Sequence, residues 1–213
     1  MEFVFVVPRS ELFPKSAPHG LALFGSPSEE AAFRSAVRRD GFFVERDYAE
    51  RTPTLKQVIP YTVVASRRGE VFTLQRSARG TEQRLYGKSS IGVGGHVNPV
   101  DAEGGGDLLE AATHRELGEE LCLGEVVSVR PLGLLNDDTD AVGAVHVGFV
   151  QLATVRGPVT VRETDQLEGG FATLDALRAR ARGEENFETW SSLLIPCLDA
   201  FIHQPVDTVT GSV

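Results

Sequence analysis

The sequence is poor in cysteine, in lysine and in long apolar runs. Its 213 residues hold two cysteines, Cys122 and Cys197, and no CxxC pair. We therefore expect neither a disulfide framework nor a thiolate zinc motif. Both cysteines fall in apolar helical patterns, which predicts buried thiols in a reducing cytoplasm.

Membrane and export signals are also missing. No apolar stretch approaches the roughly 20 residues of a membrane-spanning helix, so we expect no membrane partner. The first ten residues, MEFVFVVPRS, have an acidic start and only a short apolar run. This pattern favours a strand over a signal peptide.

Positive charge is scarce as well. Lysine and arginine number 21 against 30 aspartates and glutamates, which gives a net charge of −9. Such an acidic chain is a poor partner for nucleic acid or an anionic membrane. An anionic small molecule would need a metal ion or local arginines to offset the field.

The chain is long enough for one core with a small appendage. Residues 2–7 alternate like a strand. A helix is predicted from Pro27 to Asp40, with Ser26 as its N-cap, Glu29 in a capping box and Gly41 after its end. We place a soft boundary near residue 52, which gives an N-terminal extension (1–51), a main domain (52–205) and a flexible tail (206–213).

The main domain alternates strands and helices. Apolar patterns predict strands, then a helix, then two long strands, then two closing helices. The predicted strands cover residues 58–66, 70–76, 126–135 and 141–155, and the predicted helices cover 107–122, 173–181 and 187–202. This order predicts an α/β layered domain with a mixed sheet.

The helix at 107–122 carries an unusual cluster of carboxylates. Glu116, Glu119 and Glu120 are related by steps of three and four residues, so they share one helical face. Like charges on a partly apolar face are unfavourable unless something positive offsets them. Arg115 supplies one charge, and Mg²⁺ or Mn²⁺ is the natural second partner because these ions prefer carboxylate oxygens.

The stretch RELGEELCL, residues 115–123, resembles the Nudix box, written G-x5-E-x7-R-E-U-x-E-E-x-G-U with U apolar. It departs from the box at Cys122, which replaces a glycine, and at Asp107, which matches the first glutamate. The loop VNPVDAEGGG, residues 97–106, adds residues between Gly95 and Asp107, so their spacing is longer than the x5 of the box. The stretch SIGVGGH, residues 90–96, is similar to a bacterial branch of predicted MutT-like phosphoesterases with an N-terminal extension.

This resemblance implies a Nudix α/β/α sandwich and a metal site. Glu116 and Glu120 match the principal metal ligands and Glu119 an auxiliary one, while Arg115 orients the glutamates by a salt bridge. The carbonyl matching Gly94 or Gly95 completes such sites.

The resemblance also implies the reaction, which is attack of water on a diphosphate linked to another moiety, X. His96 stands where the superfamily's isopentenyl-diphosphate isomerase has a metal-binding histidine, so it is a candidate outer ligand. Isomerase chemistry is disfavoured, because Gly94 stands where that enzyme has its catalytic cysteine.

The general base and the substrate contacts are less clearly marked. Glu168 is the distant candidate for the base, with Glu163, Asp165 and a box glutamate as alternatives. Arg84 and Lys88 are candidates for phosphate binding, and Asn136-Asp137-Asp138 is a further acidic loop.

We predict a metal-dependent Nudix pyrophosphohydrolase that takes a small diphosphate substrate and forms a homodimer. The alternative of another class is a Nudix-like sensor domain that binds its ligand without turnover. The sequence leaves X open among nucleoside phosphates, nucleotide sugars, dinucleoside polyphosphates and isoprenoid diphosphates.

Overall fold

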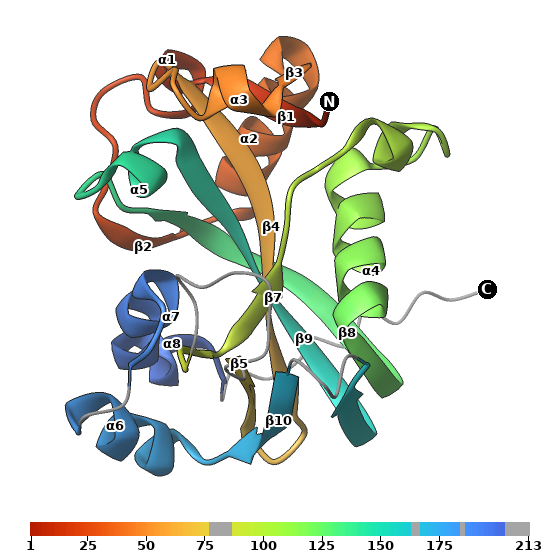
Figure 1. Cartoon of the computed structure of the whole chain (residues 1–213), viewed down its shortest axis with the longest axis vertical. Helices are drawn as coiled ribbons and strands as arrows, with labels where there is room; N and C mark the ends of the chain where they lie inside the picture. The colour runs from red at the N-terminus through yellow and green to blue at the C-terminus, as the bar shows by residue number, and fades with distance from the viewer. Residues whose placement is uncertain (77–86, 163–166, 184–185, 203–213) are drawn as a thin grey trace.

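The computed structural model describes residues 1–76, 87–162, 167–183 and 186–202. These residues form one mixed β-sheet with helices on both faces (Figure 1). The main strand order is β10-β5-β4-β9-β8-β2; off this path, β1 and β7 pair with β4, β6 pairs with β5, and β3 pairs with β1. This arrangement confirms the predicted α/β/α sandwich with a mixed sheet.

The strands of this sheet are β1 (Phe3–Pro8), β2 (Gly20–Leu23), β3 (Phe42–Glu45), β4 (Leu55–Ser66), β5 (Val71–Arg76), β6 (Ser89–Ser90), β7 (Gly92–Gly94), β8 (Leu121–Asn136), β9 (His146–Val161) and β10 (Leu167–Ala172). The helices are α1 (Arg9–Leu12), α2 (Pro27–Asp40), α3 (Arg46–Ala49), α4 (Leu108–Glu120), α5 (Ala141–Val145), α6 (Leu174–Arg182), α7 (Thr189–Leu194) and α8 (Asp199–Ile202), with short 3₁₀ turns η2 (Pro99–Ala102) and η3 (Ile195–Cys197).

Strand β4 is the centre of the sheet. It runs parallel to β9 and antiparallel to β1, β5 and β7. Eleven of its twelve residues are buried, because helices cover both of its faces. Helices α2 and α4 cover one face, and α6, α7 and α8 cover the other.

Helix α4 carries the carboxylate cluster and begins as predicted. The Asp107 side chain accepts hydrogen bonds from the backbone amides of Leu109 and Glu110, which caps the helix. The helix ends at Glu120, two residues earlier than predicted, because Leu121 already pairs with Val161 of β9. The prediction of a buried helical Cys122 is therefore wrong, since this residue is exposed on β8.

Two further local predictions need correction. Helix α2 has the predicted bounds, but the Glu29 carboxylate accepts from the amide of Gly25 and the Ser26 hydroxyl caps no amide, so the capping box does not form. Ala141–Val145 is helix α5 and not strand, because the Asp140 side chain caps its first turn at Gly143.

The N-terminal segment contributes strands to the main sheet. Strand β1 pairs with β4, and β2 pairs with the end of β8. Phe33 of α2 stacks on Phe149 of β9, with ring centroids 5.2 Å apart. Arg34 of α2 forms an ion pair with Asp107 at 2.9 Å, so the segment also contacts the cap of α4. The domain boundary near residue 52 stays a prediction.

The helices of the described part are all too short or too polar to cross a bilayer. The predicted tail at 206–213 lies outside the described residues.

The packing of α2 generates a stability prediction. Phe33 is 7% exposed, whereas Phe42 of β3 is 44% exposed. Replacing Phe33 by alanine should lower the free energy of unfolding by about 3–5 kcal/mol, the usual loss for a buried phenylalanine. Phe42→Ala is the matched control, and we expect it to change stability far less. Chemical denaturation measures both, and equal small losses would show that α2 is not part of the main cooperative unit.

Candidate active site

Arg115 is the centre of the site's ion-pair network. Its guanidinium donates to both Asp101 oxygens at 2.8 and 2.9 Å and to Glu116 at 2.7 Å. It also reaches Glu119 at 3.3 Å and the carbonyl of His96 at 2.8 Å. One side chain therefore ties helix α4 to the glycine-rich segment and to η2.

The Glu116 carboxylate lies directly against Gly95. A Cβ atom on Gly95 would come within 2.2 Å of the Glu116 Oε1 atom, so only glycine allows this approach. The Glu116 side chain is 14% exposed. Burial raises the pKa of its carboxyl group, while the hydrogen bond from Arg115 acts in the opposite direction. A cation beside Glu116 would offset the remaining cost of burying its charge.

The segment that includes β7 alternates between the two faces of the sheet. Val93 and Val97 pack in the clusters that contain α4, and Gly95 faces Glu116 of the same helix. Gly92 and Gly94 face the Tyr61 ring, because a Cβ on either would meet it at 2.3 and 3.2 Å. The segment therefore separates the α4 side of the site from the Tyr61 side.

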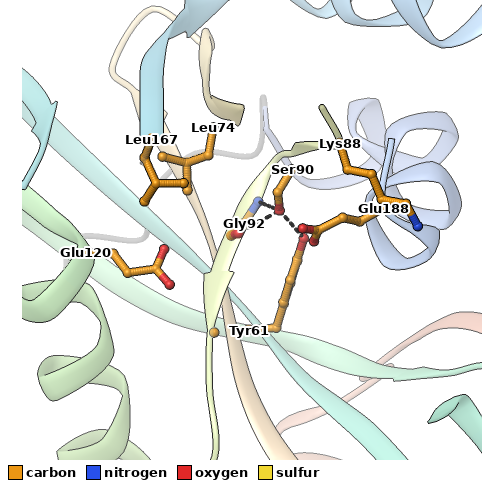
Figure 2. Close-up of a pocket in the computed structure, with 9 residues that line it drawn as sticks. Tyr61, Leu74, Lys88, Ser90, Gly92, Glu120, Leu167 and Glu188 are labelled. Atoms are coloured by element: carbon orange, nitrogen blue, oxygen red, sulfur yellow. Dashed lines mark hydrogen bonds between the residues drawn. The ribbon is translucent and has the colours of Figure 1, made fainter. Parts of the chain in front are cut away.

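A pocket opens beside β7 (Figure 2). Glu120, at the end of α4, lines it on one side, and Glu188, the residue before α7, lines it on the other. The other residues that line it are Tyr61, Leu74, Lys88, Ser90, Gly92, Gly94 and Leu167. Carboxylates from the two opposite helical layers thus meet at one pocket.

The floor of this pocket on the Tyr61 side is a fixed hydroxyl network. The Tyr61 hydroxyl lies 3.1 Å from the hydroxyls of both Ser90 and Ser191. Burial raises the pKa of Tyr61 well above its ordinary value, and the negative charges of Glu188 and Glu120 raise it further. Tyr61 therefore stays protonated, and its hydroxyl group remains available for hydrogen bonds on this side of the pocket.

The structure distributes the predicted site residues unevenly. Glu116 and Glu119 contact Arg115, whereas Glu120 and Lys88 line the pocket. The His96 imidazole lies beside His146, with 3.4 Å between their Nε2 atoms, and not beside Glu116.

The candidates for the base and the second phosphate contact are placed less directly. Glu168 is exposed on β10, next to Leu167, which lines the pocket. Because side chains alternate along a strand, the Glu168 side chain starts toward the opposite face from Leu167. Arg84, Glu163 and Asp165 lie outside the described residues.

Two residues of the site were missed from the sequence. Asp101 lies in the loop insertion, and its side chain is 3% exposed beneath Arg115. Its only signal is the Asn98-Pro99 step before it, which starts a capping box closed by Asp101. Glu188 sits inside a pattern that predicts a continuous helix, so no local signal marked it.

The acidic loop at 136–138 has a structural explanation. The fully buried Lys56 ammonium donates to Asp138 at 2.8 Å and to the carbonyls of Gly143 and His146. Arg9 also pairs with Asp138. The ion pairs with Arg9 and Lys56 hold the pKa of Asp138 well below its usual range. This loop therefore anchors α1 and α5.

The carboxylates of α4 fit a hard divalent cation. Glu116 is partly buried against glycine backbone, and Glu120 faces an open pocket one turn further along the helix. Oxygen donors of this kind suit Mg²⁺ and Mn²⁺. The described residues contain no group of three acidic, histidine or cysteine side chains already gathered around one point.

Comparison with known proteins decides the family. No family model matches the sequence. The chain is 33% identical to protein YmaB of Bacillus subtilis (strain 168), over 93% of this chain and 98% of that protein. It superposes on the crystal structure of Tm1382, a protein assigned to the Nudix hydrolases, with a TM-score of 0.77 and 27% identity. That match covers 94% of this chain and 100% of Tm1382. The chain belongs to the Nudix hydrolase superfamily.

A more distant Nudix neighbour shares the fold. The Nudix domain of Shewanella oneidensis NrtR, solved in complex with ADP ribose, matches 68% of this chain and 87% of its own length. It does so with a TM-score of 0.51 and 15% identity. The chain with the Arg115 network is thus a Nudix hydrolase and acts on pyrophosphate bonds, and Arg115 lies in the stretch that resembles the Nudix box.

The Arg115 network generates a prediction about Asp101. Asp101→Ala removes both buried carboxylate oxygens to which the Arg115 guanidinium donates in η2, so the free energy of unfolding should fall by about 3 kcal/mol. Catalytic turnover should also fall, because Arg115 then holds Glu116 less firmly. Glu103→Ala, in the same loop but exposed, is the control. Thermal unfolding and turnover measured on both variants test this, and a wild-type result for Asp101→Ala would remove Asp101 from the site.

Proposed function

We propose that this Nudix hydrolase catalyses metal-dependent hydrolysis of a diphosphate linkage in a nucleoside-diphosphate-X type of substrate. The observation that carries the proposal is the placement of Glu116 and Glu120. Arg115 holds the first against Gly95, and the second opens into the pocket beside β7. This arrangement sets the Glu120 carboxylate beside a space that a phosphate group can enter, with Glu116 one helical turn before it.

Mg²⁺ or Mn²⁺ would be held by Glu116 and Glu120, with Glu119 as an auxiliary ligand and the Gly95 backbone nearby. When bound, such an ion stabilises the charge that develops on the phosphate oxygens and lowers the pKa of a water molecule. The arrangement around Glu116 supports this, because the buried carboxylate lacks a full positive counterpart: Arg115 is shared with Asp101 and Glu119.

The chain's own residues supply binding and proton transfer. Lys88 lines the pocket, and it is our proposed contact to a phosphate oxygen, with Arg84 as a second contact from outside the described residues. Tyr61 and Ser90 present hydroxyl groups to the same space. A carboxylate that faces the pocket takes the proton from the attacking water.

Isomerase chemistry finds no support at this site. It requires an acid–base side chain at position 94. A Cβ atom on Gly94 would lie 2.4 Å from the carbonyl oxygen of Pro60, so a side chain does not fit there without moving the backbone of β4.

A sensor without turnover is the second candidate function. It is favoured by one observation, namely that a Nudix domain of the same fold, that of NrtR, was solved with ADP ribose bound. ADP ribose, itself a diphosphate linking adenosine to a sugar, therefore belongs in the substrate panel. Cleavage of ADP ribose into two products that each carry a phosphate would support the hydrolase. Tight binding of ADP ribose, without cleavage of any panel member, would support the sensor.

Exposed valines and free thiols bear on the proposed assembly and compartment. Val126 and Val127 of β8 are 42% and 38% exposed, and a homodimer would cover such an apolar strand. Cys122 and Cys197 are free thiols, which supports a reducing cytoplasm.

Metal dependence gives the central test. Turnover of the best substrate should vanish with a chelator and return with excess Mg²⁺ or Mn²⁺. Glu120→Gln keeps the shape of the side chain and removes its charge, so it should raise the barrier by about 2–4 kcal/mol. Glu110→Gln, on an exposed position of the same helix, is the matched control. Chelator-resistant hydrolysis, or Glu120→Gln rates within a factor of two of wild type, would move the metal site elsewhere.

The identity of the base is tested by a pair of variants. Glu168 is the proposal from the sequence, and Glu188 is the proposal from the pocket. Because the Glu188 side chain lines the pocket and the Glu168 side chain is exposed on β10, we expect Glu188→Gln to lower kcat by about 10²–10⁴-fold. Glu168→Gln should stay near wild type.

Metal affinity and thermal midpoint should be unchanged in both variants, which separates proton transfer from folding. A large loss in Glu168→Gln alone would restore Glu168 as the base. Full activity in both would assign the proton transfer to a box glutamate.

A further inference from the structure

Two histidines face each other on the side of the sheet away from helix α4. The Nε2 atoms of His96 and His146 are 3.4 Å apart. His146 begins β9 and is the register partner of Gln57 in β4. The alternation that places Gly95 against Glu116 places His96 on the other face, so this pair is separate from the Nudix carboxylates.

The histidine pair is oriented by the backbone. The Nδ1 atom of His146 lies 2.7 Å from the carbonyl oxygen of Val142. A carbonyl only accepts hydrogen bonds, so Nδ1 carries the proton and Nε2 holds a lone pair directed at His96. A backbone carbonyl on the far nitrogen is the usual partner that fixes a metal-binding histidine.

The separation of the two nitrogens matches a shared metal ion. Two imidazole nitrogens bound to zinc at about 2.05 Å, with a tetrahedral angle between them, are about 3.3 Å apart. The observed 3.4 Å agrees with this value. It is longer than the 2.9–3.0 Å typical of an N–H hydrogen bond.

The surroundings of the pair leave a nitrogen free for a metal ion. Both histidines are half-buried, and the Val142 carbonyl holds the proton of His146 on Nδ1, so the Nε2 lone pair is available as a ligand. The nearby positive charges are already paired with carboxylates: Arg46 with both Glu2 and Glu50, and Lys56 with Asp138.

A buried polar side chain on the same face lacks a partner. Gln57 is 1% exposed, and neither its amide oxygen nor its amide nitrogen has a hydrogen-bond partner. Residues paired across a parallel ladder point to the same face of the sheet, so Gln57 and His146 lie on one side. A water molecule bound to a metal ion at the pair would give this amide a partner.

We propose that His96 and His146 form a second metal site, selective for a zinc-like transition-metal ion, on the sheet face opposite the Nudix box. Imidazole nitrogens suit zinc, nickel or copper, whereas the box carboxylates suit Mg²⁺ and Mn²⁺. Water molecules, one of them hydrogen-bonded to Gln57, complete the coordination. The site ties β9 to the segment that carries Gly95, and it does not depend on the proposed hydrolysis.

The test is titration of the full-length protein with Zn²⁺, followed by calorimetry, in excess Mg²⁺ that fills the carboxylate site. Every sample carries Cys122→Ser, because an exposed thiol also binds zinc. We expect one tight equivalent of Zn²⁺. His146→Gln should weaken its binding by more than the roughly 10- to 100-fold that loss of an outer-shell partner produces. His114→Gln, which changes an exposed histidine, should bind like the parent.

Two further measurements keep the outcome clear. Co²⁺ bound to the parent protein should show the visible absorption of a tetrahedral site with nitrogen ligands, and Gln57→Leu should weaken binding without loss of fold. Hydrolysis with Mg²⁺ should persist in His146→Gln, and Zn²⁺ binding should persist in Glu120→Gln. Zn²⁺ affinity unchanged in His146→Gln, or equally lost in His114→Gln, would overturn the second site, whatever the hydrolysis assay shows.

Discussion

The five-donor guanidinium of Arg115 fixes the geometry on which the rest of the site depends. It joins three pieces of chain that are distant in sequence or differ in structure: helix α4 through Glu116, η2 through Asp101, and the segment after β7 through the His96 carbonyl. Lysine could not replace it, because a compact ammonium does not hold a planar fork of acceptors. Burial of Asp101 makes this arrangement stiff, since the buried carboxylate has no water with which to exchange its partner.

The same segment explains how one short run of residues serves two faces of a sheet. Val93, Gly95 and Val97 turn toward α4, while Gly92, Gly94 and His96 turn toward the opposite layer. Glycine is required wherever a neighbour comes close: Gly92 makes room for the Tyr61 ring, and Gly95 for the Glu116 carboxylate. These residues form one motif in the sequence, but alternate residues of the motif contact opposite faces of the sheet.

The features that could be predicted from the sequence are those set by local interactions. The layered fold, the bounds of α2 and the start of α4 could be predicted because they follow from periodicity and from caps such as Asp107. The pairing of Arg115 with Asp101 spans 14 residues, and its partner sits in an insertion, so spacing gave no sign of it.

Other features depended on tertiary contacts altogether. Cys122 continues an apolar helical pattern, yet the pairing of Leu121 with Val161 converts the chain to strand at that point. Glu188 reaches the pocket only because α7 packs against the Tyr61 side of the sheet. The partner of His96 is 50 residues away, so a lone histidine beside glycines looked like an addition to the box.

Charge sets the order in which ligands can assemble at the pocket. Glu120 and Glu188 face it from opposite layers, and Lys88 is the one lysine or arginine among the described residues that line it. A diphosphate entering this space meets two carboxylates and a protein of net charge −9, so its approach alone is unfavourable. A divalent cation held by the α4 carboxylates, as proposed above, would offset this negative charge before the substrate arrives. In that proposal the repelling glutamates on one helix make the pocket favour substrates that carry a metal ion or meet one already bound.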